Sequence, residues 1–186
     1  LLKTGAALGS TISSAALAAG GFVTTWMSLN GTDLRAQRFS TTGTPIANDA
    51  EILVATTAGV AGTTAVAELL DGGFIVAWSA NDGTGQDGIF AQRYDSAAAP
   101  LNGVFQVSNN NLTHHFEPTV VGLADGGYLV TWTKHIGDND DDIYGRLYNA
   151  DGTTRKDEWR LNDFTSHNQN RSAVAASDDG GFVVTW

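Results

Sequence analysis

The sequence predicts an all-β protein built from tandem four-stranded units of the β-propeller type. Three observations lead to this prediction: a seven-residue pattern that recurs, short runs of strand-forming residues between glycine-rich turns, and apolar residues on both faces of those runs. No stretch shows a convincing 3.6-residue apolar period over the length of a helix. We therefore expect strands throughout the chain.

The recurring pattern is a Gly-Gly-aromatic segment that ends in tryptophan. Its copies read GGFVTTW, GGFIVAW, GGYLVTW and GGFVVTW, and they begin at Gly20, Gly72, Gly126 and Gly180. The copies are separated by 52, 54 and 54 residues, and such a constant spacing indicates internal repetition. A second block recurs in the same phase as LRAQRFS (34–40), IFAQRYD (89–95) and, more loosely, IYGRLYN (143–149).

Each unit contains four short runs of strand composition. In the second unit, Asp71-Gly72-Gly73 separates the first two runs and predicts a tight hairpin, because glycine adopts positive φ freely. In Phe74–Trp78, the alternate residues on both faces are apolar, so this strand is expected to be buried on both sides. A four-stranded sheet covered on both faces by its own copies is a propeller blade, with a unit of about 50 residues.

The predicted units occupy 12–55, 64–108 and 118–162, and the first half of a fourth unit occupies 172–186. Another β-repeat or solenoid array and a string of Ig-like modules are the alternatives. Solenoid rungs are usually shorter, and Ig-like modules need about seven strands and ~100 residues. Because propellers close with about four to eight blades, we expect a fragment of a longer polypeptide, or copies of the chain that together complete a ring.

The composition indicates a folded and acidic chain. Of its 186 residues, 42% are hydrophobic, and 20 acidic residues against 10 basic ones give a net charge of −10. Such a surface repels phosphate backbones, so nucleic acid is not an expected partner. No run reaches the ~18 apolar residues of a membrane helix, so no membrane insertion is expected. The lack of cysteine excludes a disulfide framework and a thiolate metal site.

The segments 118–128 (PTVVGLADGGY), 89–95 (IFAQRYD) and 105–109 (FQVSN) match a repeat pattern with the blocks DGGFVVTW, IFAQRYD and FxVN. This pattern resembles the tandem repeats of large bacterial secreted and surface proteins, which often also carry haemolysin-type calcium-binding or cadherin-like modules. The first copy departs from it at Ala18-Ala19, and the third has Gly145-Arg146-Leu147 in place of Ala-Gln-Arg. The resemblance implies an extracellular or cell-surface location and a role in adhesion, whereas the fold alone does not define an activity.

Two acidic loops offer candidate ligands for calcium, which prefers oxygen donors. The candidates are Asp138, Asp140 and Asp142 in the third unit and Asn81, Asp82 and Asp87 in the second. The first three have the one-three-five spacing of calcium loops. However, Ile143 stands where an EF-hand has its sharp-turn glycine, and Asn149 stands where it has its closing glutamate. The alternative is that both loops are simply acidic and solvated.

Three histidines are candidate ligand-binding residues. In a propeller, the loop that enters the first strand and the loop between the second and third strands open on the same face. This topology places His114 and His115 near His135 and the third acidic loop. Adjacent residues of an extended chain point in opposite directions, so His114 and His115 are not expected to bind one metal ion. Hydrogen bonding within the loops is the alternative.

The tryptophans that end the repeats (Trp26, Trp78, Trp132 and Trp186) could stack on sugars, but their position on the Phe/Tyr face of each strand favours core packing. Arg38 and Arg93 recur among apolar neighbours inside predicted strands. A recurrent arginine in such surroundings is expected to have an acidic or carbonyl partner.

The sequence lacks the motifs of nucleophilic catalysis: it has no G-x-S-x-G elbow, no cysteine and no phosphate-binding glycine loop. We therefore predict a non-catalytic extracellular module for binding, adhesion or surface scaffolding, stabilised by calcium. Its expected partners are other repeats of the same polypeptide, copies of itself, a glycan or a surface protein. The alternative is a propeller that binds carbohydrate or hydrolyses polysaccharide from its loop face, because the separation of paired carboxylates depends on the fold.

Overall fold

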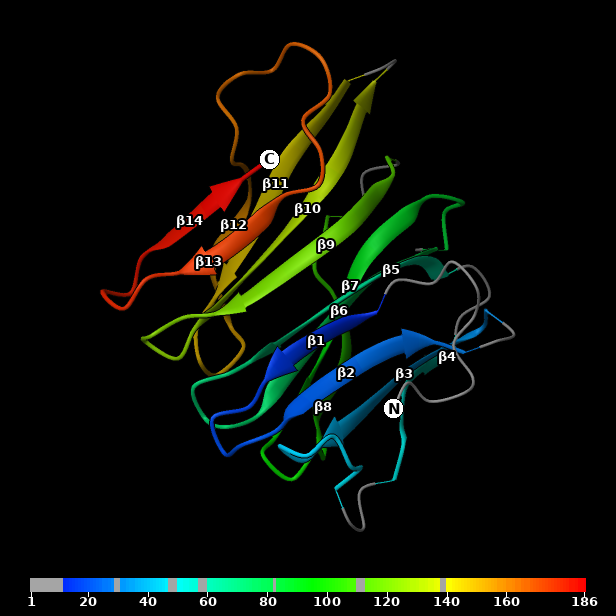
Figure 1. The fold of residues 1–186 in the computed structure, drawn as a ribbon. Coiled ribbons are helices and arrows are strands. Elements are labelled where there is room, and N and C mark those ends of the chain that lie inside the picture. The colour runs from blue at the N-terminus through cyan, green and yellow to red at the C-terminus, as the bar shows by residue number, and fades with distance from the viewer. Residues whose placement is uncertain are drawn as a thin grey trace.

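The computed structural model describes residues 12–28, 31–46, 50–56, 60–81, 83–109, 113–137 and 140–186. These residues form fourteen β-strands and no α-helix, so none of them belongs to a helix that could cross a membrane. The strands make three four-stranded antiparallel sheets and one two-stranded sheet, each in sequence order (Figure 1). The prediction of an all-β chain of small four-stranded antiparallel sheets is confirmed.

The strands of the four sheets have the following bounds. The first sheet contains β1 (Ser13–Ala16), β2 (Phe22–Met27), β3 (Asp33–Phe39) and β4 (Ile52–Thr56). The second contains β5 (Val60–Glu68), β6 (Phe74–Asn81), β7 (Asp87–Tyr94) and β8 (Pro100–Gln106). The third contains β9 (His115–Gly122), β10 (Tyr128–Gly137), β11 (Asp140–Tyr148) and β12 (Thr154–Arg160). The fourth contains β13 (Ala173–Ala176) and β14 (Phe182–Thr185).

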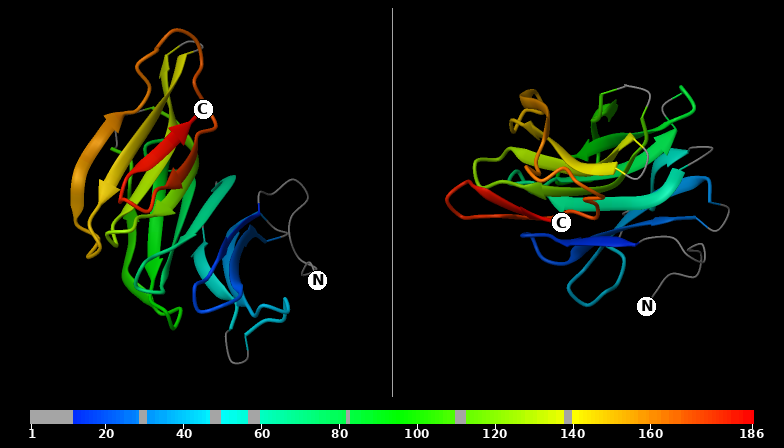
Figure 2. Two further views of the ribbon diagram at one scale, coloured as in Figure 1. Left: turned by 60° about the vertical axis from the view of Figure 1, so that its left-hand side comes forward. Right: turned by 90° about the horizontal axis from the view of Figure 1, so that it is seen from above.

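The sheets are stacked one against the next, as Figure 2 shows. Their first strands meet in the order β1, β5, β9 and β13, and these contacts bring together segments that are far apart in the sequence. The first strand of each sheet is therefore the inner one, and the last strand lies at the rim. Over the described residues the stack remains open and does not close into a ring.

The core consists of apolar layers between neighbouring sheets. Strand β6 contributes to two of them: Phe74, Val76 and Trp78 pack against the first sheet, while Ile75 and Ala77 pack against the third. All five side chains are almost fully buried. The alternation of apolar residues on both faces is therefore explained by a sheet that is covered on both sides.

An aromatic pair recurs at the start of the second strand of each complete sheet. Phe22 stacks on Phe39, Phe74 on Tyr94 and Tyr128 on Tyr148, with ring centroids 5.1, 4.8 and 4.8 Å apart. The tryptophans at the other end of these strands (Trp26, Trp78 and Trp132) are buried, as predicted. Trp186 differs, with 54% of its surface exposed, because no described strand packs over β14.

The Asp-Gly-Gly segment forms the hairpin between the first two strands of a sheet. In the second sheet, the N–H of Gly73 donates to Asp71 Oδ1 at 2.9 Å, and Gly72 has a φ of 80°. A Cβ on Gly73 would lie 2.2 Å from the carbonyl oxygen of Tyr94. The three residues thus supply a side-chain cap, a left-handed backbone and a close approach to the adjoining strand.

Candidate functional site

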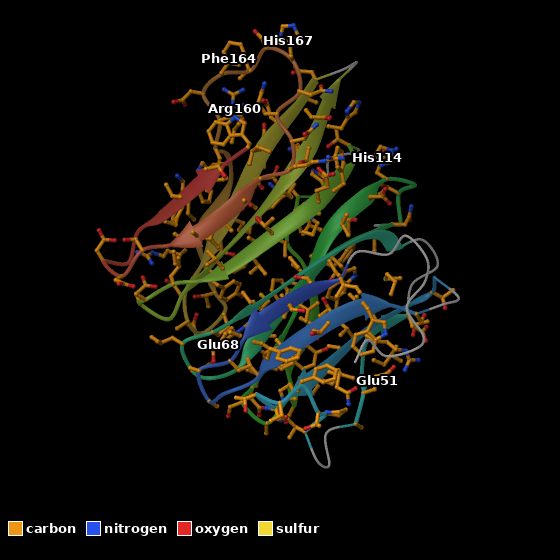
Figure 3. The ribbon with its side chains drawn as sticks, in the orientation of Figure 1. Glu51, Glu68, His114, Arg160, Phe164 and His167 are labelled. Atoms are coloured by element: carbon orange, nitrogen blue, oxygen red, sulfur yellow. The ribbon has the colours of Figure 1, made fainter. Side chains whose placement is uncertain are left out.

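The loop face is the end of the sheets that carries the connections between sheets and the loops between second and third strands. Figure 3 shows His114 at this end, whereas Glu68 lies at the opposite end, among the Gly-Gly hairpins. The backbone N–H of His135 donates to the carbonyl oxygen of His114 at 2.9 Å. The entry to β9 and the β10–β11 hairpin are therefore side by side on the loop face.

His114 contacts the second sheet through Asp87 at the start of β7. The N–H of Asp87 donates to His114 Nδ1 at 3.3 Å, and Asp87 Oδ2 lies 3.3 Å from the same nitrogen. A neutral ring accepts the backbone N–H, and a protonated ring would face the carboxylate. The imidazole is about half exposed, so it is accessible from solvent.

His115, the next residue along the chain, is buried. Its Nδ1 lies 3.2 Å from the carbonyl oxygen of Asp87, and its ring meets Trp132 edge-on, with centroids 6.4 Å apart. These contacts make His115 part of the packing between the second and third sheets.

His135 pairs within its own hairpin. Its Nδ1 lies 2.8 Å from Asp141 Oδ1, and the carbonyl oxygen of Asp141 accepts from the N–H of Gln169 at 2.7 Å. The pair thus faces the connection between β12 and β13. His114 and His135 contact different sheets, so the three candidate histidines do not converge on one ligand.

The candidate acidic residues have separate partners. Asp142 is buried, and its Oδ1 accepts from Asn162 Nδ2 at 2.6 Å while Arg160 Nη1 lies 3.6 Å from its Oδ2. Asn162 also accepts the N–H of Ile143 at 2.8 Å, so it ties the segment after β12 to β11. Asp140 Oδ1 is buried and accepts no hydrogen bond.

In the second sheet, Asn81 Oδ1 accepts the N–H of Gly83 at 2.9 Å and closes a local turn. Asp82 and Asp138 lie outside the described residues. Within the part of the chain that the structure describes, no group of three or more His, Asp or Glu side chains is arranged to hold a metal ion. Calcium binding stays a prediction.

A buried ion pair lies close to the loop face and was not predicted from the sequence. Lys134 Nζ lies 2.6 Å from Glu158 Oε1 and 4.5 Å from the centroid of the Tyr144 ring. Glu158 Oε2 accepts the N–H of Asn109 at 2.7 Å. The pair therefore also connects β12 of the third sheet to the end of the second sheet. Glu158 occurs in a polar run without any repeating feature, which leaves no sequence signal for its role.

A second region missed by the sequence is a groove of about 400 Å³ at the rim, between the second and third sheets. We call it the rim groove. It is lined by Arg93, Leu101, Asn102, Gly103, Val104, Phe105, Gln106, Tyr128, Arg146, Tyr148, Gly152 and Thr154. The signal that could have found it is the departure of Gly145-Arg146-Leu147 from the Ala-Gln-Arg block, because it places an extra arginine on the face toward the second sheet.

No protein-family model and no curated protein matches the sequence. Several solved structures are similar in fold. An α-L-arabinofuranosidase from Lactobacillus brevis matches with a TM-score of 0.54 and 13% identity over 82% of this chain and 53% of that one. An α-L-arabinofuranosidase from Fusarium graminearum, solved with an iminosugar inhibitor, matches with a TM-score of 0.57 and 13% identity over 95% of this chain and 58% of that one.

A fucose lectin from Kordia zhangzhouensis, solved with methyl-fucoside, matches with a TM-score of 0.51 and 10% identity. The alignment covers 84% of this chain and 100% of the lectin. By contrast, the chain spans only slightly more than half of each arabinofuranosidase. At these identities the likeness concerns the fold alone, and it supports a β-propeller-like arrangement of the sheets.

Proposed function

We propose that this chain is a non-catalytic, extracellular carbohydrate-binding module whose sheets are blades of a β-propeller. The similar solved structures include arabinofuranosidases and a fucose lectin, so the fold is one on which carbohydrates are bound and cleaved. The internal repeat and its resemblance to surface-protein repeats support a role in adhesion. Other repeats of the same polypeptide, or copies of the chain, would complete the arrangement.

The observation that carries the non-catalytic part is that three carboxylates near the loop face are held by protein partners. Asp141 is paired with His135, Glu158 with Lys134, and Asp142 with Asn162 and Arg160. Glycoside hydrolysis generally needs one protonated carboxyl group and one free carboxylate on either side of the scissile bond. Carboxylates that are fixed by cations and amides are poorly suited to either task, and the geometry therefore favours binding.

A glycan array combined with a hydrolysis screen tests this proposal. The chain is applied to immobilised neutral and acidic polysaccharides, and the same polysaccharides are incubated with it in solution and assayed for new reducing ends. We expect retention on at least one class of glycan without release of sugar. Turnover of any polysaccharide contradicts the non-catalytic part, and a lack of retention on every glycan contradicts the binding part.

A further inference from the structure

The rim groove is bounded by the outer strand of one sheet and the turn of the next. Strand β8 supplies one wall, with Val104 exposed and Phe105 in edge contact with the ring of Tyr148. The other wall comes from β10, β11 and the turn between β11 and β12. A volume of about 400 Å³ lies within the range of small-molecule sites.

Four buried polar atoms around this groove have no hydrogen-bond partner. They are Arg93 Nε, Arg146 Nε, Gln106 Nε2 and Tyr128 Oη. The first three can only donate, and the hydroxyl can donate as well. A buried donor without an acceptor is unfavourable, so four such donors on residues that line or adjoin one groove make it suited to an acceptor-rich ligand.

The two guanidinium groups are held by hydrogen bonds from their Nη atoms, and their Nε atoms stay unpaired. Arg93 Nη2 donates to the carbonyl oxygen of Ala150 at 2.7 Å, and Arg146 Nη1 donates to that of Val107 at 2.6 Å. The remaining Nη2 of Arg146 contacts Asn109 and Asp157. Both groups are therefore already oriented before a ligand arrives.

The residues that line the groove include two arginines and no acidic residue, although the chain as a whole is acidic. Arg93 is only 7% exposed, and its ion-pair partner Asp71 lies 3.7 Å away and is half exposed. The partner of Arg146, Asp157, has 77% of its side chain exposed. Both partner carboxylates are more than half exposed and are therefore screened by solvent, whereas an anion that reaches the buried guanidinium groups is screened less.

Burial also keeps the tyrosines of the groove protonated. It raises the pKa of Tyr148 to about 12 and raises the pKa of Tyr128 above its ordinary value. The two hydroxyl groups therefore remain neutral donors over the physiological pH range.

The equivalent positions between the first and second sheets lack this chemistry. Counted 54 residues back in the repeat, Gln92 stands for Arg146, Phe74 for Tyr128 and Ala98 for Gly152. The glycine matters because a Cβ on Gly152 would lie 2.7 Å from Arg93 Nη1. The third unit thus differs from the second at Gly152 and at two of the four donors, Tyr128 and Arg146.

We propose that the rim groove binds the carboxylate of an acidic sugar, such as a uronic acid residue of a polysaccharide. This inference rests on the proposed carbohydrate-binding function and names its site and its class of ligand. A carboxylate has two acceptor oxygens for the unpaired Nε–H groups of Arg93 and Arg146, and the hydroxyls of the sugar supply acceptors for Tyr128 Oη and Gln106 Nε2. The exposed Val104 side chain gives the sugar ring an apolar contact.

Calorimetric titration of the full chain with a galacturonic acid trimer tests the proposal, with the neutral galactose trimer as the comparison ligand. We expect the acidic trimer to bind and the neutral one to bind at least about tenfold more weakly, because a hydrogen bond to a charged group is worth roughly 1.5–3 kcal/mol. Equal binding of the two trimers would overturn the proposal.

Two variants locate the site. Arg146→Gln introduces the residue that the second unit has at this position, and it should weaken binding of the acidic trimer by about tenfold or more. Tyr128→Phe removes only one hydroxyl and again introduces the residue of the second unit. It should weaken binding of the acidic trimer about threefold to tenfold. Arg155→Gln, which removes an exposed arginine outside the groove, is the matched control and should bind like the wild type. Thermal melting establishes that each variant is folded.

The outcomes separate this proposal from the broader function. If Tyr128→Phe is folded and binds the acidic trimer like the wild type, the rim groove is not the site. If the chain is retained on neutral glycans but ignores uronates, the ligand class is wrong and the carbohydrate-binding function stands. If polyglutamate of equal charge binds as tightly as the acidic trimer, the assignment to a sugar is overturned.

Discussion

Arg93 donates from Nη2 to the carbonyl oxygen of Ala150, and this 2.7 Å hydrogen bond links the second sheet to the third. Arg38 makes the equivalent bond from the first sheet to the second, with its Nη1 2.5 Å from the carbonyl oxygen of Ser96. The recurrent arginine thus holds the turn between the third and fourth strands of the next sheet. The third repeat has Leu147 at this position.

Replacement of Arg93 by leucine, the residue of the third repeat, is expected to lower the free energy of unfolding by about 1–3 kcal/mol. The Ala150 carbonyl loses its charged donor, and the Tyr128 ring loses a cation 5.6 Å from its centroid. Urea denaturation measures the loss. Arg155→Gln removes an exposed ion pair with Asp125 and should change stability by less than about 1 kcal/mol. Equal losses in the two variants would show that the inter-sheet bond contributes nothing.

Because the inner strands approach closely at Gly122, we expect a substitution there to reduce stability strongly. A Cβ there would lie 2.3 Å from the carbonyl oxygen of Glu68 on the neighbouring sheet, so Gly122→Ala should destabilise the chain by about 1–3 kcal/mol or more. At Gly137 a Cβ meets nothing within 4 Å, and Gly137→Ala should stay within about 0.5 kcal/mol of the wild type. Thermal melting of the two variants compares them, and a melting point for Gly122→Ala as high as that for Gly137→Ala refutes the contact.

The buried pair of Lys134 and Glu158 predicts non-additive mutations. Lys134→Met leaves the Glu158 carboxylate buried without its cation, which is expected to cost about 3–5 kcal/mol. The double variant Lys134→Met with Glu158→Gln should recover part of this loss, because no unpaired charge remains and the amide oxygen can still accept from Asn109. A double-mutant cycle by chemical denaturation gives the coupling. Strictly additive losses would mean that the two charges do not interact.

The lowered pKa of the hairpin residue Asp125 leads us to expect a loss of stability in acid. The N–H of Gly127, followed by Arg155, holds the pKa of Asp125 below its ordinary value of 3.8. A carboxylate with a lowered folded-state pKa stabilises the fold above its unfolded pKa, and this contribution disappears as the pH falls through the folded one. Asp125→Asn keeps an acceptor for Gly127 but cannot titrate. Its melting point should therefore fall less than that of the wild type between pH 4 and pH 2, and parallel profiles would contradict this cause.

Calcium stabilisation, predicted from the two acidic loops, is tested by melting the chain with added calcium and with excess chelator. We expect calcium to raise the midpoint and Asp140→Asn to reduce the increase, since Asp140 retains a buried oxygen without a partner. A midpoint that is the same in calcium and in chelator would leave the acidic loops as solvated surface.

The regular part of the fold could be predicted because short local sequence patterns determine it. Alternate apolar residues in Phe74–Trp78 indicate two buried faces, and Asp71-Gly72-Gly73 indicates the hairpin, without knowledge of any distant residue. Trp186 ends the same sequence pattern as Trp78, but it is exposed. The pattern specifies which face a side chain occupies, whereas burial also requires a neighbouring sheet to cover that face.

The candidate sites depended on contacts between repeats and could be predicted only in part. The topology was enough to place His114 and His135 on one face, but not to show that they contact different sheets. Arg146 was visible as a departure from the repeat. Its partners Val107 and Asn109 directly follow the last strand of another sheet, 39 and 37 residues earlier, so only the fold shows that the arginine lines a groove.

Amide chemical shifts, recorded while the chain is titrated with an oligogalacturonide, test the proposed rim-groove site most directly. Binding in the groove predicts that the perturbed amides cluster at 101–106 and 146–154, on both sides of the groove. Perturbations confined to the loop face at 113–117 and 140–142, or no perturbation at saturating ligand, would contradict it.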